Sequence, residues 1–323
     1  MEKRALGQTG LSIAPLGFGG NVFGWTIDEK TSFAVLDAFV DNGFNAIDTA
    51  DVYSSWAPGN KGGESETIIG KWLKSRPGLR DKVVIFTKVG SDLGFPGQKG
   101  LSARWIGEAV EGSLSRLGID AIDLYFSHWP DASTPYAETL GAYEKLLKAG
   151  KIKAIGASNL DAAQLSEALK VADETGLPRY QVLQPEYNLY DRDGFDGALR
   201  DLCIEQGLGV VTYFSLASGF LSGKYRSHDD LGKSARGEDA AKYLTTRGEA
   251  ILSALDDIGA AHSSSPAEVA LAWLMARDGV TAPIASATSI AHVESFARAA
   301  ALRLGSADIA ALDAASAPAE DAP

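Results

Sequence analysis

The chain alternates short apolar runs, rich in β-branched and aromatic residues, with longer segments whose apolar positions repeat at helical spacing. Short runs of this kind predict buried strands, and the longer segments predict amphipathic helices. The predicted strands cover residues 13–18, 45–48, 83–88, 124–127, 152–158, 182–184, 208–213 and 280–284. Helical patterns lie between them, so that strand and helix alternate along the whole chain.

Several predicted helices carry recognisable start and stop signals. The helix that opens after Ser102 keeps its apolar positions on one face and meets a terminating glycine at Gly118. Asp161 followed three residues later by Gln164 is a capping-box pattern. Ser265, which precedes a proline and an acid, combines an N-cap with a favourable first turn for a further helix.

The alternation indicates one domain over residues 1–323, without a linker or a shift in composition. Eight strand–helix repeats predict a (β/α)8 TIM barrel. A doubly wound open sheet is the competing architecture. Its dinucleotide fingerprint is missing, because residues 17–22 lack the third glycine.

Three segments depart from a minimal barrel. Residues 1–12 precede the first predicted strand, and we expect them to cap the bottom of the barrel. Residues 217–247, after the seventh strand, are rich in glycine, serine and charge and lead into a helix over 248–262. A connection this long in a compact domain is usually functional. Residues 316–323 contain serine, alanine, proline and acids, and we expect a frayed tail there.

Composition narrows the possible partners. The 323 residues include 30 Lys and Arg against 42 Asp and Glu, a formal net charge of -12 that disfavours a nucleic-acid partner. Cys203 is the only cysteine, which rules out an intrachain disulfide and a thiolate zinc cluster, and we expect no metal site. No apolar stretch resembles a signal peptide or approaches the roughly 18 residues of a membrane helix. We therefore expect a cytoplasmic protein with no membrane partner.

Polar residues close most of the predicted strands, where the active-site mouth of a barrel is expected. They are Asp48, Lys88, His128, Ser158, Asn159, Gln184 and Tyr213. Tyr53 follows Asp48 by five residues, in the loop after the second strand. This arrangement predicts that all eight side chains meet at one rim.

A tyrosine beside a lysine, an aspartate and a histidine suits the transfer of a proton to a carbonyl oxygen. The phenol is a poor acid at neutrality, with a free pKa of about 10, and a neighbouring ammonium lowers that value. Asp48 can balance the charge of a buried Lys88, and His128 can orient the carbonyl. Such a general acid serves carbonyl reduction, provided that a hydride donor is present.

Each residue also has a simpler interpretation. Asp48 can cap its loop, Lys88 can form a barrel-end ion pair or the Schiff base of an aldolase, and His128 can be an ordinary hydrogen-bonded rim residue. Tyr53 taken alone is most often a packed aromatic. The four residues together favour the catalytic interpretation, because four independent coincidences would otherwise share one face.

Five segments resemble the aldo-keto reductase family, in the form of its microbial ketone and sugar-type branch. They are Asn-Ala-Ile-Asp-Thr-Ala-Asp-Val-Tyr at 45–53, Ile-Phe-Thr-Lys at 85–88, Ser-His-Trp-Pro-Asp at 127–131, Ala-Ser-Asn at 157–159, and Gln-Pro-Glu-Tyr-Asn at 184–188. The resemblance runs from about residue 6 to about residue 315, with the motifs in order.

The resemblance implies a (β/α)8 barrel that binds NADP(H) across its carboxyl face, without a metal. Tyr53 would be the general acid in reduction and the base in oxidation, with its pKa lowered by Lys88. Asp48 would pair with Lys88, and His128 would position the carbonyl. The nicotinamide would be held by Ser158, Asn159 and Gln184, with Tyr213 stacked on its ring.

The same resemblance assigns the rest of the cofactor site. The pyrophosphate would be held by Leu216, Ser218, Gly219, Leu221, Gly223 and Lys224 in the long loop. The adenosine 2′-phosphate would meet Ser286, Thr288, Ser289 and His292. Many relatives carry Lys or Arg in that stretch, whereas here Arg298, one or two turns later, would have to compensate. NAD(H) is therefore the alternative to NADP(H). A second departure is Phe214-Ser-Leu after Tyr213, where relatives usually have Ser-Pro-Leu.

We expect an NADP(H)-dependent oxidoreductase that reduces aldehydes or ketones to alcohols. The substrate would be a neutral, partly apolar carbonyl compound or a sugar-like ketone, in contact with Phe23, Trp25, Trp56 and Trp129, although packing is an equal explanation for Trp56. A non-catalytic, cofactor-sensing subunit and a Schiff-base aldolase that uses Lys88 are the alternatives. The residues specify neither one substrate nor an oligomeric state.

Overall fold

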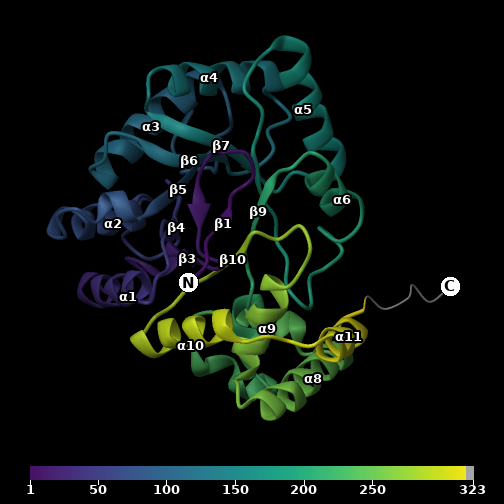
Figure 1. Cartoon of the computed structure of the whole chain (residues 1–323). Coiled ribbons are helices and arrows are strands. Elements are labelled where there is room, and N and C mark those ends of the chain that lie inside the picture. The colour runs from purple at the N-terminus through teal and green to yellow at the C-terminus, as the bar shows by residue number, and fades with distance from the viewer. Residues whose placement is uncertain (318–323) are drawn as a thin grey trace.

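Parallel strands close into a barrel in the computed structural model, which describes residues 1–317 (Figure 1). The barrel strands are β3 (Gly17–Gly19), β4 (Ala46–Asp48), β5 (Val84–Val89), β6 (Ile122–Ser127), β7 (Ile152–Ser158), β8 (Val182–Gln184), β9 (Gly209–Thr212) and β10 (Ala282–Ala285). Each strand pairs with the next, and β10 pairs with β3. The predicted TIM barrel is therefore confirmed, and the open sheet is excluded.

Helices surround this barrel and follow the strands in turn (Figure 1). The helices after the first six barrel strands are α1 (Glu29–Asp41), α2 (Glu64–Ser75), α3 (Ala103–Leu117), α4 (Tyr136–Lys148), α5 (Ala162–Thr175) and α6 (Ala198–Glu205). The seventh and eighth are α9 (Pro266–Met275) and α10 (Ile290–Ala301). The additional helices are α7 (Gly237–Ala240), α8 (Thr246–His262) and α11 (Ser306–Ala315).

The predicted helix signals operate as capping groups. The Ser102 side chain accepts a hydrogen bond from the Trp105 N–H, and Gly118 ends that helix in the left-handed conformation. Asp161 and Gln164 form the predicted capping box at the start of α5. Caps of this kind satisfy the free N–H groups of the first turn, which explains why the helix starts were legible in the sequence.

The first predicted strand was partly wrong. Instead of one strand over 13–18, β2 (Ser12–Ile13) pairs with β1 (Arg4–Ala5) in an antiparallel hairpin, and only β3 joins the barrel. Pro15 lies between β2 and β3, and a proline has no N–H to donate to a sheet. The hairpin closes the bottom as expected, because Gly7 lies against the backbone of Gln181 and Gly209, next to the starts of β8 and β9.

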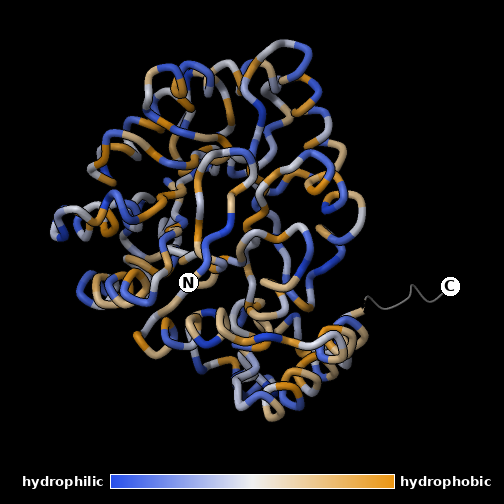
Figure 2. The backbone as a smooth tube through the Cα atoms, in the orientation of Figure 1, coloured by the Kyte–Doolittle hydropathy of each residue, from blue (hydrophilic) through white to orange (hydrophobic). Residues whose placement is uncertain are grey.

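The apolar core forms two shells. Inside the barrel, the buried side chains of Val84, Phe86, Leu124 and Phe126 pack with Leu6 from the hairpin. A larger cluster fills the space between the barrel and its helices. Helices in Figure 2 accordingly alternate hydrophobic and hydrophilic segments along their length, as expected when one face is buried.

The long connection after β9 is present as predicted. It contains short 3-10 turns at Ala217–Ser222, His228–Lys233 and Ala241–Tyr243, and α7 lies among them. The following helix, α8, begins two residues before the predicted 248 and ends at His262. A further 3-10 turn precedes α1 at Gly20–Val22, and another precedes β5 at Arg80–Lys82.

The predicted tail over 316–323 was wrong at its first residue. Ser316 is buried, its hydroxyl donates to the Leu312 carbonyl oxygen at 2.6 Å, and it accepts from Arg192 at 2.8 Å. Residues 318–323 lie outside the described residues.

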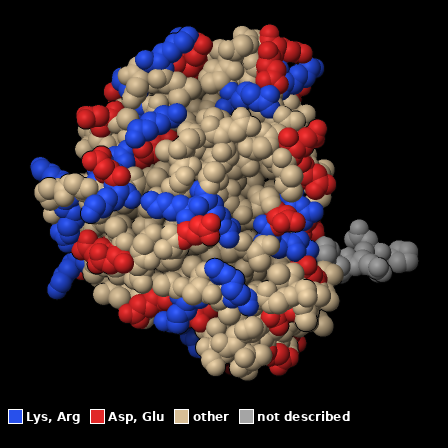
Figure 3. All heavy atoms as spheres, viewed as in Figure 1, with Lys and Arg blue, Asp and Glu red and all other residues tan. Residues whose placement is uncertain are grey.

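Acidic and basic side chains are interspersed over the face shown in Figure 3. Among residues 1–317, no helix combines the length and apolarity needed to cross a membrane.

Candidate active site

The alternation of side chains along the strands brings the predicted catalytic residues together. Val84 and Phe86 point into the barrel, so Lys88, two residues further, continues the same row at the top. The same spacing places Asp48 above Ala46 and His128 above Phe126. Their polar groups therefore end the apolar interior of the barrel at one mouth.

Lys88 is fully buried and its ammonium is surrounded by acceptors. It donates to both Asp48 carboxylate oxygens at 2.7 Å, to the Thr49 carbonyl oxygen at 2.9 Å and to the Tyr53 hydroxyl at 2.9 Å. Asp48 also accepts from the Tyr53 hydroxyl at 3.2 Å and from the Gln184 amide at 2.9 Å. The carboxylate compensates the buried ammonium, which would otherwise be strongly unfavourable.

The net pKa shift of Tyr53 is opposite in direction to the lowering that Lys88 alone was expected to cause. Burial of the phenol, together with the nearby charge of Asp48, raises the pKa of Tyr53 well above its usual value. Burial also lowers the pKa of Lys88, against the opposing effect of Asp48. Because the carboxylate lies beside both groups, it offsets the field of the ammonium at the phenol. Tyr53 therefore holds its proton firmly at neutral pH.

His128 lies beside Tyr53, with 6.0 Å between the two ring centroids. Burial and the charge of Lys88 lower the pKa of His128 well below its usual value, so that the imidazole is neutral. Its Nδ1 lies 2.9 Å from the hydroxyl oxygen of Ser91, and its ring stacks on Trp129. A neutral imidazole can donate one hydrogen bond to a carbonyl oxygen.

The residues predicted to hold the nicotinamide form a connected row beside this group. Ser158 Oγ donates to the Gln184 carbonyl oxygen at 2.7 Å, and Asn159 Nδ2 donates to the His128 carbonyl oxygen at 2.9 Å. Tyr213 Oη donates to Asn159 Oδ1 at 2.7 Å. The row therefore continues from the proton-holding residues along the mouth of the barrel.

A cavity of about 560 Å³ begins at Asp48 and Tyr53 and extends to Thr288 and His292. Other predicted cofactor residues that line it are Tyr213, Leu216, Ser218, Gly219, Lys224 and Ser286. Its length and its two ends suit an extended ligand rather than a compact one.

Ser158, Asn159 and Gln184 do not line this cavity, and neither do three further predicted cofactor residues. Leu221 is fully buried in the apolar core, and Gly223 ends the 3-10 turn after β9. Ser289 caps α10 by accepting from the His292 N–H. Their contribution is to the shape of the loop and the helix that border the cavity.

Close backbone approach is built into the cavity wall. Ser218 and Gly219 both have left-handed backbone conformations, with φ of 55° and 93°. A Cβ added to Gly219 would lie 2.9 Å from Lys224 Cε, so a larger residue would displace that lysine. Glycine at this position keeps the lysine beside the cavity.

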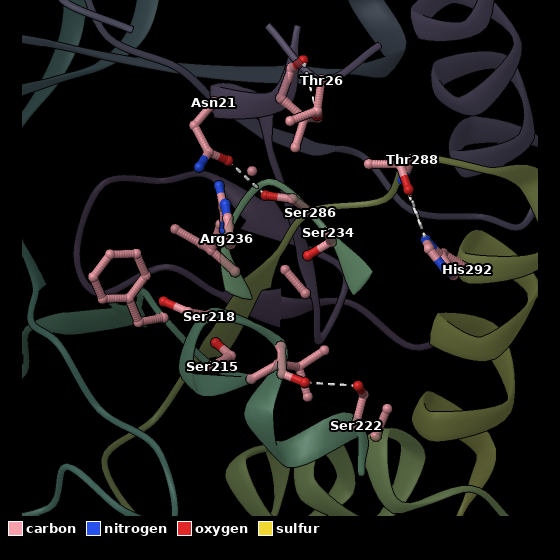
Figure 4. Close-up of a pocket in the computed structure, with 18 of the residues that line it drawn as sticks. Asn21, Thr26, Ser215, Ser218, Ser222, Ser234, Arg236, Ser286, Thr288 and His292 are labelled. Carbon is pink, nitrogen blue, oxygen red and sulfur yellow. Dashed lines mark hydrogen bonds between the residues drawn. The ribbon is translucent and has the colours of Figure 1, made fainter. Parts of the chain in front are cut away.

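Arg236, from the long loop, lines the cavity and was missed by sequence reasoning. Its guanidinium points toward Asn21 and Ser286 and lies over the ring of Trp25, 5.4 Å from the ring centroid (Figure 4). Among residues 1–317, it takes part in no ion pair. The only sequence signal was its position in a loop already suspected of function. The local sequence does not distinguish an arginine that lines a cavity from one that faces solvent.

Lys224 supplies a second cation in the same wall, and it likewise lacks a carboxylate partner within the described part of the chain. Partial burial, followed by the charge of Lys224, lowers the pKa of His292. Arg298 does not compensate for the missing base near Thr288, because its guanidinium pairs with Glu268 at 2.8 Å. Cationic character in this cavity thus comes from the long loop.

The predicted substrate aromatics divide into two groups. Phe23 has no exposed surface and stacks on Phe18 with ring centroids 5.2 Å apart, so its prediction as a substrate contact was wrong. Trp25 lines the cavity and packs edge-on against Trp56. Trp56 and Trp129 are each 48% exposed.

Phe214 is a further exposed aromatic on the cavity wall, which sequence reasoning had noted only as a departure from the family pattern. Together with Trp25, it makes the wall near Tyr53 largely apolar and aromatic. Within residues 1–317, no group of three or more histidine, cysteine or acidic side chains could hold a metal ion.

Comparison with known proteins identifies the same family that the sequence motifs resemble. The sequence matches the Aldo/keto reductase family over residues 15–317. It is 36% identical to an uncharacterized oxidoreductase, YrpG, from Bacillus subtilis (strain 168), over 88% of this chain and 86% of the relative.

Two further relatives cover comparable lengths. Aldo-keto reductase str7 from Strobilurus tenacellus is 33% identical over 95% of this chain and 87% of its own. A probable voltage-gated potassium channel subunit beta from Oryza sativa subsp. japonica is 34% identical over 89% of this chain and 88% of its own.

Proposed function

The chain belongs to the aldo/keto reductase family, whose members reduce carbonyl compounds with a nicotinamide cofactor, and we propose that it reduces aldehydes or ketones to alcohols with NADP(H). We assign the proton transfer to Tyr53. The observation that carries the assignment is the Tyr53 hydroxyl, held between the Lys88 ammonium and the Asp48 carboxylate at the wall of an open cavity.

When bound, NADPH would supply the hydride for the carbonyl carbon. Tyr53 donates its proton to the carbonyl oxygen as negative charge develops there. The phenolate left on Tyr53 is stabilised by the Lys88 ammonium, which lies 2.9 Å from the hydroxyl oxygen. In the reverse direction the same phenolate accepts the proton of the alcohol.

The raised pKa of Tyr53 supports this assignment for the reductive direction. A general acid must carry its proton at the start of each turnover, and burial with Asp48 keeps the phenol protonated at neutral pH. Proton loss becomes favourable only when the substrate oxygen develops negative charge. Neutral His128 fits a second role, the donation of a hydrogen bond that orients the carbonyl.

The cavity fits the proposed cofactor by its charge and its length. Arg236 and Lys224 line the cavity and form no ion pair among the described residues, so they suit the phosphate groups of the cofactor. Asn159 and Tyr213 would hold the nicotinamide end, beside the proton donor. Thr288 and His292 would meet the adenosine end. Lys224, whose charge lowers the pKa of His292, is the cation near that end and would favour NADP(H) over NAD(H).

The Tyr53→Phe variant tests the proposal, because it removes the proton and keeps the ring. Oxidation of NADPH with a panel of aldehydes and ketones should fall by at least about a thousandfold, while NADPH binding followed by fluorescence is retained. Tyr136→Phe, on outer helix α4, is the matched control and should keep full activity. Equal turnover in Tyr53→Phe and the control would refute the assignment.

The similarity to a relative named as a potassium channel subunit beta supports a second candidate, a subunit that binds the cofactor without rapid turnover. The two candidates differ in rate. An enzyme consumes NADPH for many cycles with a suitable carbonyl, whereas a sensing subunit oxidises bound cofactor slowly and about once.

A Schiff-base aldolase is disfavoured, because the Lys88 amine is already enclosed by Asp48, Thr49 and Tyr53. Borohydride treatment in the presence of a carbonyl substrate should leave no adduct on Lys88.

A further inference from the structure

Ser91 lies between two residues of the candidate active site and hydrogen-bonds to both. Trp129 Nε1 donates to Ser91 Oγ at 3.1 Å, and Ser91 Oγ lies 2.9 Å from His128 Nδ1. The two rings also stack, with 13° between their planes. Ser91 follows β5, whereas His128 and Trp129 follow β6, so adjacent strand ends bring the three residues together.

The chemistry of these groups fixes the direction of each hydrogen bond. An indole N–H can only donate, so Ser91 Oγ accepts from Trp129. The serine hydrogen then needs an acceptor of its own, because Ser91 is only 8% exposed. Among the hydrogen bonds of the described residues, His128 Nδ1 is the one acceptor within reach.

The opposite arrangement leaves a polar group unsatisfied. If His128 Nδ1 carried the hydrogen and donated to Ser91, the serine oxygen would accept twice and its own hydrogen would have no partner. Burying such a hydrogen without an acceptor is unfavourable. The network therefore selects the neutral imidazole whose hydrogen is on Nε2.

His128 Nε2 is available to a ligand. This nitrogen has no hydrogen-bond partner among residues 1–317. It is not fully buried, so a ligand can reach it. The ring itself neighbours Tyr53, the proposed proton donor. An Nε2–H group there can donate to the carbonyl oxygen that Tyr53 protonates.

We propose that Ser91, oriented by the Trp129 indole, is a positioning residue that holds His128 as its Nε2–H tautomer. The inference rests on the proposed carbonyl reduction, because the donor is useful only when an oxygen meets Tyr53 and His128 together. Without the serine hydroxyl, the other tautomer becomes accessible and presents a lone pair to that oxygen, which repels it.

The tautomer of His128 can be measured in the full chain without substrate or cofactor. Nitrogen NMR of protein with 15N-labelled histidine distinguishes a ring nitrogen that carries hydrogen from one that accepts it. The chain has 4 histidines, and the His128→Gln variant identifies the signals of His128. We expect hydrogen on Nε2 and an accepting Nδ1 in the unaltered protein, and a mixture of tautomers in Ser91→Ala.

Two variants separate positioning from mere packing. Ser91→Thr keeps the hydroxyl and should restore the single tautomer. Trp129→Phe keeps an aromatic stack but removes the indole donor, so it should shift the signals in the same direction as Ser91→Ala. If Ser91→Ala fails to fold, Trp129→Phe alone decides the question. Ser113→Ala, at a buried serine of α3, should leave all histidine signals unchanged.

Turnover gives the functional readout. Ser91→Ala should lower kcat by about tenfold to a hundredfold, the range found when the outer hydrogen-bond partner of a metal-binding histidine is removed. Ser91→Thr should retain most of the activity. A hydrogen on Nδ1 in the unaltered protein, or an unchanged tautomer in both Ser91→Ala and Trp129→Phe, would overturn the inference. Neither result would affect the Tyr53→Phe test.

Discussion

The Lys88 ammonium lies 2.9 Å from the Tyr53 hydroxyl and 2.7 Å from the Asp48 carboxylate. The lysine therefore contacts two groups and has a different role toward each. It balances a buried carboxylate in the resting protein, and it is already in place to stabilise a phenolate during turnover. A group shared in this way links the stability of the barrel mouth to the proposed chemistry.

Removal of the ammonium should reduce both properties. In Lys88→Met the buried Asp48 loses its counter-charge, and we expect the free energy of unfolding to fall by about 3–5 kcal/mol. The turnover number should fall by at least about a hundredfold, because the phenolate loses its stabilising charge. Urea unfolding and NADPH consumption measure the two effects.

The double variant Lys88→Met with Asp48→Asn provides the control. It removes both charges, so it should be more stable than Lys88→Met alone while remaining inactive. A double variant that is no more stable than the single one would show that the ion pair does not explain the loss.

The buried tyrosines predict a loss of stability in alkali. Burial raises the pKa of Tyr53, Tyr125 and Tyr143 well above the ordinary value. Above about pH 10 the unfolded chain loses protons that the folded chain retains, so the unfolded state is favoured as the pH rises. The free energy of unfolding should be unaffected by these groups below about pH 9 and should fall steadily above about pH 10.

Urea unfolding at several pH values measures this dependence. In Tyr53→Phe the free energy of unfolding should fall less steeply with pH, because the folded chain retains one proton fewer relative to the unfolded chain. A decline of equal steepness in the variant would mean that Tyr53 titrates normally in the folded chain.

The sequence indicated Asp48, Lys88 and His128 as candidate catalytic residues because a simple rule connects their positions. Strand side chains alternate, so polar residues that continue inward-facing rows must meet at the mouth. The direction of the Tyr53 pKa shift was beyond this rule, because it depends on how near Asp48 lies to the phenol and how well water is excluded. Those quantities are set by packing of the whole mouth.

The errors have equally local causes. Phe23 and Trp25 lie in one short turn, and only the backbone path decides which of them faces the cavity. Arg236 was missed because nothing in an irregular loop predicts where a side chain points. The split of the first strand at Pro15 was legible, since proline interrupts a sheet, and it was overlooked in favour of the apolar run.

Arg236 should contribute to cofactor affinity. Arg236→Gln should raise the Kd for NADPH by about tenfold to a hundredfold, which corresponds to the loss of charge-assisted hydrogen bonds. Arg226→Gln is the matched control, because Arg226 is exposed and paired with Asp256 away from the cavity. Fluorescence titration compares the two, and similar Kd values for both variants would exclude Arg236 from the binding site.

The adenosine end should be adjustable in its preference. His292→Arg places a permanent guanidinium where the present imidazole has a lowered pKa, so it should raise the ratio of NADPH to NADH affinity by about tenfold. Lys224→Ala should change that ratio in the opposite direction. Titration of each variant with both cofactors gives the ratios. If His292→Arg raised the affinity for NADH as much as that for NADPH, the 2′-phosphate would not lie beside position 292.

The packing of the barrel interior sets a last constraint on the site, which can be tested with two glycines. A Cβ at Gly156 of β7 would collide with the ring of Phe126 and lie 3.0 Å from the Val182 carbonyl oxygen. Gly156→Ala should therefore lower the free energy of unfolding by about 1–3 kcal/mol. The substitution should also reduce turnover, because Phe126 lies directly below His128.

Gly141→Ala is the opposing control, since a Cβ there meets no atom within 4 Å on helix α4. Alanine is favoured over glycine in a helix, so this variant should be stabilised by about 0.5–1 kcal/mol without a change in turnover. Thermal unfolding and NADPH consumption give both numbers. If Gly156→Ala were as stable as the unaltered chain, the barrel interior would have space for the extra methyl group, contrary to the close approach to Phe126.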